Sequence, residues 1–265
     1  MSTEKRVYRL EAHGPPGTGM HEMVCNPEDF ASALPTQTLH VYYEDEDLGM
    51  SVGVWTTSPM QEAYGPYPGD EFIWLLEGGF KMVDGDNNVL DTYKQGDCVY
   101  FRNAAPVSWV QEEHLRKFYI TYLNPKREVP AGVPAEGAVK ALDPSIAPEQ
   151  MTILEDTDPF IINGDKPTQR DYIYFTNDTD DMFVGMWDST PFESEMAPFP
   201  SHEFVRLLEG EIVIKEADGT VSRFEKDDTF FVPKGTVCSW KTTGYVRKYY
   251  AVVDPAEDDA EAQRR

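Results

Sequence analysis

The sequence predicts an all-β fold built of two tandem β-barrel domains of the jelly-roll type, with short flanking helices. Two observations carry this prediction. The chain of 265 residues repeats itself once, and each copy consists of short alternating apolar and polar runs separated by turn residues. Such a chain is long enough for two domains that each bury a core.

The repeat is visible when the sequence is placed on itself with a shift of 132 residues, which is 187 minus 55 for the pair Trp55 and Trp187. "PTQTLHVYYEDEDLGMSVGVW" then aligns with "PTQRDYIYFTNDTDDMFVGMW", and Glu71 aligns with Glu203. After a gap of one residue, "VYFRNAAPVSWV" aligns with "FFVPKGTVCSWK". Agreement over a whole module indicates two homologous units in tandem.

Within each unit the runs are rich in Val, Ile, Phe, Tyr and Thr, and the dipeptides Asp84-Gly85 and Asp218-Gly219 separate two of them. These patterns predict β-strands joined by hairpins. A unit of this kind must hide its strand edges, and a closed barrel or a two-sheet jelly roll does so. Alternate residues of each strand then face a lumen.

Helix signals are confined to the flanks. "NPEDFASAL" begins with Asn26 as an N-cap followed by Pro27, and "APEQMTILED" lies in the connector. The predicted organisation is an N-terminal arm at residues 1–35, a first barrel at 36–125, a connector at 126–167, a second barrel at 168–255 and an acidic tail at 256–265.

Composition limits the partners. With 23 Lys and Arg against 47 Asp and Glu the net charge is -24, which disfavours nucleic acid and anionic membranes. The three widely spaced cysteines contain no CxxC pair, and no apolar run is long enough for a signal peptide or a membrane span. We therefore expect a cytoplasmic protein.

The run "EFIWLLEG" with the later "VYFRNAAPVSW" resembles the two sequence motifs of the cupin superfamily. In the second copy, "EFVRLLEGEIVIKEADG", "FFVPKGTVCSWK" and "VRKYY" are similar to the subgroup of (S)-ureidoglycine aminohydrolase-like and ethanolamine-utilisation Q-type cupins. The resemblance covers both repeats and implies the cupin barrel. It leaves the reaction open, because cupins include hydrolases, lyases, isomerases, dioxygenases, decarboxylases and non-catalytic binders.

Metal-binding members of the resembled family carry a His-x-His before a glutamate and a further histidine after the proline of the second motif. Glu71 and Glu203 keep the glutamate, but no histidine stands at the other positions, and the late one is replaced by Val107 and Cys238. Since one carboxylate holds a divalent ion weakly, we predict no metal ligands and no cofactor. A bound Mn, Zn or Ni ion is the alternative.

Alternation from Glu71 places Ile73 and Leu75 in the first lumen and Phe72 and Trp74 outside. The residues expected to edge this lumen are Trp55, Tyr64, Tyr67, Glu71, Tyr100, Arg102 and Trp109. Aromatic walls suit a small polar ligand, and an arginine suits an anionic one. The alternative is that the aromatic side chains fill the barrel as core.

The second lumen is expected to be more apolar, with Trp187, Glu203, Cys238 and Trp240 as the candidate ligand-contacting residues. Without a cation, a buried Glu203 would have a raised pKa or a hydrogen-bonded partner. Cys238 lacks a histidine that could activate it, so we interpret it as a small buried hydrophobe. His202 is out of phase with Glu203 and is expected to point outward. The pairs Arg116-Lys117 and Arg247-Lys248 are expected to pair with neighbouring acids, with ligand binding as the alternative.

Three functions remain open. The first is a bicupin without a metal that binds a small metabolite, either without catalysis or as an acid-base hydrolase, lyase or isomerase using Glu71 with Tyr64 or Tyr67. The second is a metal-dependent aminohydrolase of the kind the resemblance implies. The third is a module that forms a homodimer through an outward barrel face. A stoichiometric metal would favour the second function, and a monomer in solution would count against the third.

Overall fold

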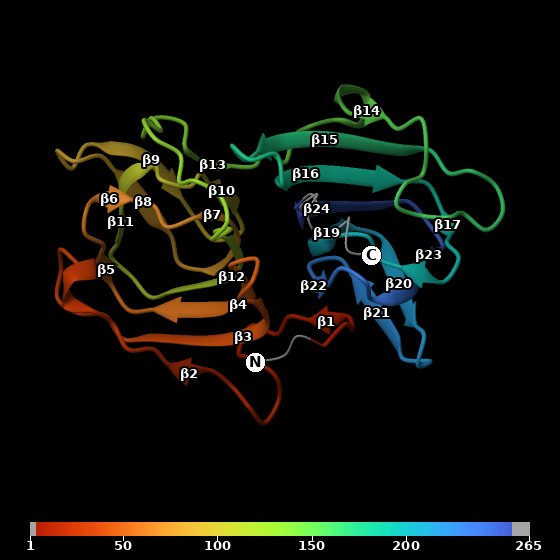
Figure 1. The fold of residues 1–265 in the computed structure, drawn as a ribbon, viewed down its shortest axis with the longest axis horizontal. Helices are drawn as coiled ribbons and strands as arrows, with labels where there is room; N and C mark the ends of the chain where they lie inside the picture. Colours follow the sequence, from red (N-terminus) through yellow and green to blue (C-terminus); the bar gives the residue numbers. More distant parts are fainter. Residues whose placement is uncertain (1–3, 256–265) are drawn as a thin grey trace. The chain divides into compact units, whose positions relative to one another are not determined.

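The computed structural model describes residues 4–255, so the predicted acidic tail lies outside the described residues. The predicted all-β class is confirmed, because the regular structure is antiparallel sheet apart from two single turns of 3-10 helix. Two compact units divide the chain between Ile146 and Ala147, and Lys5–Val7 belong with the second unit. This division falls inside the segment that the sequence assigns to the connector. Figure 1 follows the first unit from red to yellow-green and the second from green to blue.

The first unit contains a seven-stranded sheet in the order β13-β10-β7-β12-β4-β3-β2. A smaller sheet has the order β5-β11-β8-β9, and β6 also pairs with β11. The bounds are β2 His21–Glu22, β3 Gln37–Asp45, β4 Met50–Thr57, β5 Met60–Gln61, β6 Gly65–Pro66, β7 Asp70–Glu77, β8 Phe80–Val83, β9 Val89–Tyr93, β10 Cys98–Phe101, β11 Pro106–Gln111, β12 Leu115–Tyr122 and β13 Val139–Ala141.

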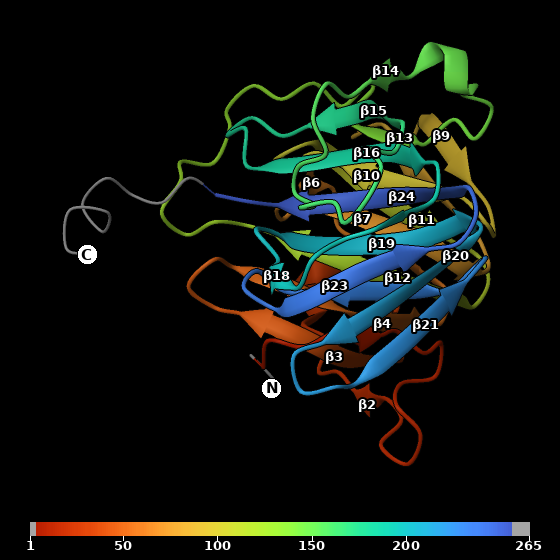
Figure 2. The ribbon, with the colours of Figure 1, turned by 90° about the vertical axis from the view of Figure 1, so that its right-hand side faces the viewer.

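The second unit repeats this plan, with β22-β19-β24-β16-β15-β14 in its large sheet and β17-β23-β20-β21 in its small one, where β18 also pairs with β23. Figure 2 shows β23, β20 and β21 beside one another. The bounds are β14 Thr152–Ile153, β15 Gln169–Thr176, β16 Met182–Ser189, β17 Phe192–Glu193, β18 Ala197–Pro198, β19 His202–Glu209, β20 Glu211–Glu216, β21 Val221–Glu225, β22 Thr229–Val232, β23 Val237–Thr242 and β24 Val246–Val253. The remaining strand, β1 Tyr8–Arg9, lies in the N-terminal arm.

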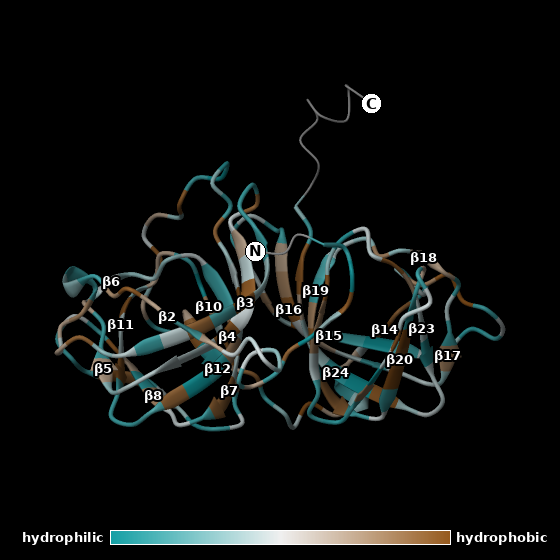
Figure 3. Ribbon diagram, turned by 90° about the horizontal axis from the view of Figure 1, so that it is seen from below, coloured by the Kyte–Doolittle hydropathy of each residue, from teal (hydrophilic) through white to brown (hydrophobic). Residues whose placement is uncertain are grey.

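Each unit closes around its own apolar core. Ile73 and Leu75 of β7 are fully buried in the first core, as are Val205 and Leu207 of β19 in the second. Their membership of the two core clusters agrees with the predicted phase of both strands. Phe72, Phe204 and His202, which were expected to point outward, are nevertheless buried. Hydrophobic residues accordingly lie among the polar residues of the strands, for example in β20 (Figure 3).

The predicted flanking helices are wrong in extent. Only Pro27–Asp29 and Pro148–Gln150 form single 3-10 turns, and Asn26 makes no side-chain cap. After the first turn, Phe30 bridges to Glu62, and the Ala31 N–H donates to the Gln61 carbonyl at 2.9 Å. Pairing with the barrel thus replaces the helical hydrogen bonds that the local sequence favours. Among the described residues, none of the helical segments has the length and apolarity needed to cross a bilayer.

Candidate functional site

The first barrel contains a cavity of about 750 Å³. Its wall is formed by β3, β4, β7, β11 and β12 together with the 3-10 turn of the arm. The tryptophan, tyrosine and charged side chains of this wall could contact a polar ligand. They are Trp55, Tyr64, Tyr67, Trp109 and Tyr119, and Glu28, Asp29, Glu62, Glu71 and Lys117.

A buried ion pair lies in this cavity. Nζ of Lys117 on β12 lies 2.8 Å from Oε1 of Glu71 on the adjacent β7, and the two side chains are only 9% and 5% exposed. The Tyr67 hydroxyl donates to Oε2 of the same carboxylate. Glu71 is therefore held by two donors, one of them charged, which fixes its position.

Two tryptophans flank the lysine. Its Nζ lies 5.0 Å from the ring centroid of Trp55 and 5.1 Å from that of Trp109. Trp109 is in turn stacked on Phe80, and its indole N–H donates to Oε1 of Gln111 at 2.9 Å. The ammonium group thus gains cation-π contact with rings whose positions are fixed by packing.

The side chains near Glu71 do not fit the metal site of the resembled family. No group of three or more His, Cys, Asp or Glu side chains among residues 4–255 is arranged to hold a metal ion. The position beside the glutamate is taken by a lysine ammonium group, which cannot donate a lone pair while it is protonated. Lys117 therefore supplies the positive charge next to Glu71.

Glu62 is a second acidic group of the cavity, and sequence reasoning missed it. Its backbone is fixed by the Glu62 N–H, which donates to the Trp109 carbonyl at 2.9 Å, and by the Ser108 hydroxyl, which donates to the Glu62 carbonyl at 2.7 Å. Within the described part of the chain no side chain hydrogen-bonds its carboxyl group. Burial raises the pKa of Glu62 to about 7; Lys117 lowers it, and the carboxylates of Glu71 and Asp29 raise it. This carboxyl group changes charge near neutral pH.

The second barrel repeats the ion pair. Nζ of Lys248 lies 2.6 Å from Oε1 of Glu203, with the side chains 4% and 7% exposed. The lysine again lies between two tryptophans, 4.8 Å from the Trp187 ring and 4.9 Å from the Trp240 ring. The expectation that Lys117 and Lys248 pair with acids is confirmed, and Lys248 is the partner of Glu203 that the sequence left open.

The surroundings of the second pair differ from those of the first. Phe160, which is 7% exposed, packs its ring 5.3 Å from Trp240 and 5.0 Å from Phe192. It also lies 6.3 Å from Trp187, so an apolar ring occupies the space beside the tryptophans that flank Lys248. The repeat shift places Phe160 opposite Glu28 of the first barrel, since 160 minus 132 is 28. An apolar ring in the second barrel therefore takes the repeat position of Glu28, which lines the cavity of the first.

The structure separates the candidate residues into three groups. Trp55, Tyr67, Glu71 and Trp109 line the cavity together, and Tyr64 lies at its rim with half of its surface exposed. Trp187, Glu203, Cys238 and Trp240 are buried in the second barrel. Burial raises the pKa of Cys238 to about 11, which agrees with its interpretation as an unreactive side chain.

The third group corrects the sequence prediction. Tyr100 and Arg102 were expected to edge the lumen, but neither lines the cavity. Phe101 between them is fully buried and stacks 4.7 Å from the Tyr67 ring and 5.7 Å from the Trp109 ring. Because neighbouring side chains of a strand point to opposite faces, Tyr100 faces away from the lumen, and Arg102 follows the last residue of β10.

The two lysines were expected to pair with neighbouring acids but were not placed inside the barrels, although the repeat carries a signal for this place. Lys117 and Lys248 occupy matching places in "LRKFY" and "VRKYY", and their identity in two diverged barrels points to a shared role. The repeat also begins earlier than predicted, because the bridge of Phe30 with Glu62 has its counterpart in the bridge of Ile162 with Ser194.

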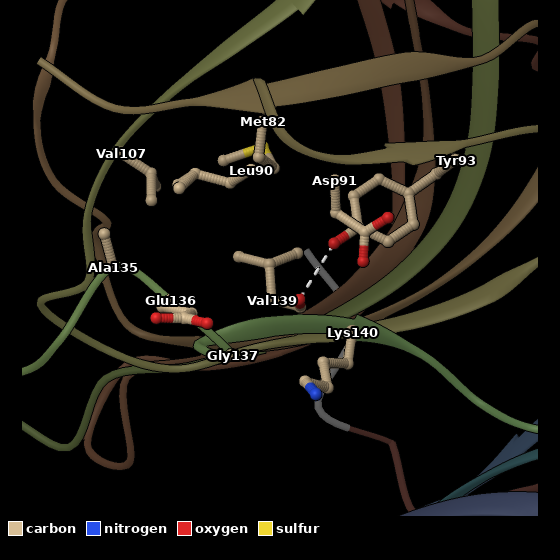
Figure 4. A pocket seen from close by; sticks show the side chains of 10 residues that line it. All are labelled: Met82, Leu90, Asp91, Tyr93, Val107, Ala135, Glu136, Gly137, Val139 and Lys140. Atoms are coloured by element: carbon tan, nitrogen blue, oxygen red, sulfur yellow. Dashed lines mark hydrogen bonds between the residues drawn. The ribbon is translucent and has the colours of Figure 1, made fainter. Parts of the chain in front are cut away.

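A smaller cavity of about 170 Å³ is lined by residues of β8, β9 and β13 in the first unit (Figure 4). Val107 lines both cavities. The Tyr93 hydroxyl beside the smaller cavity donates to the Val139 carbonyl at 2.8 Å. At about 30 Å³ for each water molecule this space suits a few waters, so the larger cavity is the candidate site.

Comparison with known proteins supports the fold. Residues 177–250 match the EutQ-like cupin domain, so the chain contains a cupin-family domain. A solved protein of unknown function from Pseudomonas syringae pv. tomato, of the DUF861 family, is 26% identical with a TM-score of 0.72, covering 94% of this chain and 100% of that one. A search of the curated proteins finds no match to this sequence.

Two more distant structures show the fold alone. YlbA from E. coli, also of the DUF861 family, is 12% identical with a TM-score of 0.53 and covers 97% of this chain and 95% of that one. A cupin 2 conserved barrel domain protein from Leptotrichia buccalis is 11% identical with a TM-score of 0.52 and covers 87% and 92% of the two chains.

Proposed function

We propose that the first barrel binds a small polar molecule without a metal, and that the second barrel serves a structural role. One observation carries the proposal: the first barrel contains a 750 Å³ cavity over a buried ion pair, whereas in the second barrel Phe160 packs on Trp240, which flanks the equivalent lysine. A volume of this order and aromatic walls with a few polar groups are typical of small-molecule sites.

In this proposal the Lys117–Glu71 ion pair helps to orient the ligand. Lys117 and Glu71 satisfy each other, so they form a rigid polar floor whose remaining hydrogen-bonding capacity can orient a ligand. The ligand is not anionic in this proposal, because Arg102, the side chain that favoured an anion, does not line the cavity.

Glu62 gives the same cavity a capacity for acid-base chemistry. An effective general acid or base has a pKa near the working pH, and Glu62 meets this condition with a pKa of about 7. Glu71 was the sequence-based candidate for this role, but Lys117 and Tyr67 already engage both of its oxygens. Glu62 is therefore the group that we propose for proton transfer.

The second candidate is the metal-dependent aminohydrolase that the sequence resemblance implies. Elemental analysis of protein purified without an affinity tag separates the two proposals. Our proposal expects well below one equivalent of Mn, Zn or Ni per chain, and a stoichiometric ion that is lost on Glu71→Gln would overturn it.

Ligand binding is tested by a thermal-shift screen with small polar molecules at millimolar concentration. The test variant is Tyr64→Ala at the cavity rim, and the matched control is Met196→Ala, the equivalent position of the second barrel; the two residues are 52% and 41% exposed. A hit is expected to weaken in Tyr64→Ala and to persist in Met196→Ala. Equal loss in both variants, or loss only in Met196→Ala, would overturn the assignment to the first barrel.

A further inference from the structure

Acidic side chains outnumber basic ones in the cavity of the first barrel. Four carboxylates line it, from Glu28, Asp29, Glu62 and Glu71, against the single ammonium group of Lys117. Lys117 is paired with Glu71. In the described part of the chain no Lys or Arg lies within ion-pair distance of the other three acids.

These acids are not required by the fold, because the second barrel lacks all three of them. The repeat shift of 132 places Phe160 opposite Glu28, Ile161 opposite Asp29 and Ser194 opposite Glu62. Ser194 keeps the backbone role of Glu62, since its N–H donates to the Trp240 carbonyl at 2.8 Å as that of Glu62 does to the Trp109 carbonyl. The same backbone hydrogen bond therefore forms with a serine here, and Glu62 adds a charge that the strand pairing does not need.

The cavity wall is also suited to an organic cation. Trp55 and Trp109 already place their rings 5.0 and 5.1 Å from the Lys117 ammonium group, and Tyr64 and Tyr67 add aromatic surface nearby. Aromatic faces combined with carboxylates stabilise ammonium and guanidinium groups through the ring quadrupole and the opposite charge. The net charge of -24 would also attract such a molecule over a distance.

We propose that the molecule bound by the first barrel carries a positively charged nitrogen, an ammonium or guanidinium group, which pairs with the Glu62 carboxylate inside the aromatic wall. Asp29 and Glu28 extend the negative charge toward the mouth. This inference rests on the proposed binding function and adds the charge class of the ligand.

Three small aromatic probes of similar size test it: the permanent cation benzyltrimethylammonium, the neutral benzyl alcohol and the anion phenylacetate. Isothermal titration calorimetry of the full chain measures each at low salt and at pH 8. We expect the cation to bind at least about tenfold more tightly than either of the other probes. Added salt is expected to weaken the binding of the cation more than that of the other two probes.

The variants Glu62→Gln and Glu62→Ser remove the proposed counter-charge, and the latter introduces the residue of the second barrel. Each is expected to weaken cation binding about tenfold and to leave benzyl alcohol binding nearly unchanged. The matched control is Glu112→Gln, which removes the same charge from an exposed pair with Lys81 on the same barrel. It is expected to leave all three affinities unchanged.

The pH dependence gives a second readout. The charged or titratable groups that face Glu62 are Asp29 from the turn, Glu71 from β7, Lys117 from β12 and Tyr67. Because the probe is permanently charged, only the protein titrates, and its affinity is expected to rise several-fold from pH 6 to pH 8 as Glu62 loses its proton. The same rise is expected to be absent in Glu62→Gln.

Failure of the two proposals can be told apart. If the neutral or anionic probe binds the cavity as tightly as the cation, or if Glu62→Gln leaves cation binding unchanged, the charge class is wrong while the binding site stands. If none of the probes binds, and Tyr64→Ala changes no signal from the wider screen, both proposals are overturned.

Discussion

Nζ of Lys117 lies 2.8 Å from Oε1 of Glu71, and the same relationship recurs between Lys248 and Glu203 at 2.6 Å. Both lysines sit between two tryptophans. Each barrel is therefore built around an internal cation, supplied by β12 in the first unit and by β24 in the second. In the first barrel the cation borders an open cavity, and in the second Phe160 packs against the two tryptophans that flank the cation.

Loss of one partner from the buried pair is expected to be costly. Lys117→Met leaves the Glu71 carboxylate buried without its cation, which destabilises a protein by about 3–5 kcal/mol. The double variant Lys117→Met/Glu71→Gln removes both charges and is expected to lose clearly less, because no unpaired charge remains. Urea unfolding followed by tryptophan fluorescence measures both. A loss below about 1 kcal/mol in the single variant would contradict the buried pair.

Phe160→Ala is expected to empty the space beside the second ion pair. Removal of a buried phenylalanine costs about 3–5 kcal/mol, so the unfolding transition of this variant shifts to lower urea. Benzyltrimethylammonium binding is expected to stay unchanged, because the cavity of the first barrel does not involve this residue. Loss of cation binding in folded Phe160→Ala would show that the assignment of the two barrels is wrong.

Gly53 is expected to tolerate no side chain. A Cβ at this position would lie 2.5 Å from the His40 carbonyl oxygen and 2.6 Å from the Tyr119 hydroxyl. Tyr119 lines the cavity, so Gly53→Ala must displace either the strand or this ring, at a cost of about 1–3 kcal/mol. Gly244→Ala is the control, because nothing lies within 4 Å of its Cβ position. Equal stability of the two variants in urea would contradict the packing of Tyr119 on β4.

The charge of Glu62 predicts a pH dependence of stability. Its pKa is raised from 4.5 to about 7, so the folded state favours the protonated form. The contribution of protonated Glu62 to the stability of the folded protein is fully present below pH 4.5 and is lost as the pH rises through 7. The free energy of unfolding of Glu62→Gln is therefore expected to exceed that of the parent by on the order of 2 kcal/mol at pH 8 and by almost nothing at pH 4.5. An equal effect at both pH values in urea unfolding would show that the Glu62 pKa is not raised.

The sequence predicts the fold well, because tandem repetition and strand alternation are local patterns that directly reflect barrel geometry. The phases of β7 and β19 follow from Glu71 and Glu203 for the same reason. The two helices were overpredicted, since pairing of Phe30 with Glu62 is a long-range contact that overrides the local signal at Asn26-Pro27.

The site was only half predictable. Trp55, Tyr67, Glu71 and Trp109 line the cavity as expected, but the phase of β10 could not be read from "VYFRN", where apolar and polar residues do not alternate cleanly. Lys117 and Glu62 become neighbours of Glu71 only through sheet pairing and barrel closure, and nothing in "LRKFY" or around Glu62 states that contact.

The central claim is that the first barrel binds its ligand over the Lys117–Glu71 pair without a metal. A high-resolution crystal structure of chelator-treated protein grown with benzyltrimethylammonium tests it most directly. We expect density for the cation in the first barrel, in contact with Trp55 and the Glu62 carboxylate, with Lys117 still bonded to Glu71. Density for a metal ion on Glu71, or for the probe beside Lys248 in the second barrel, would contradict the claim.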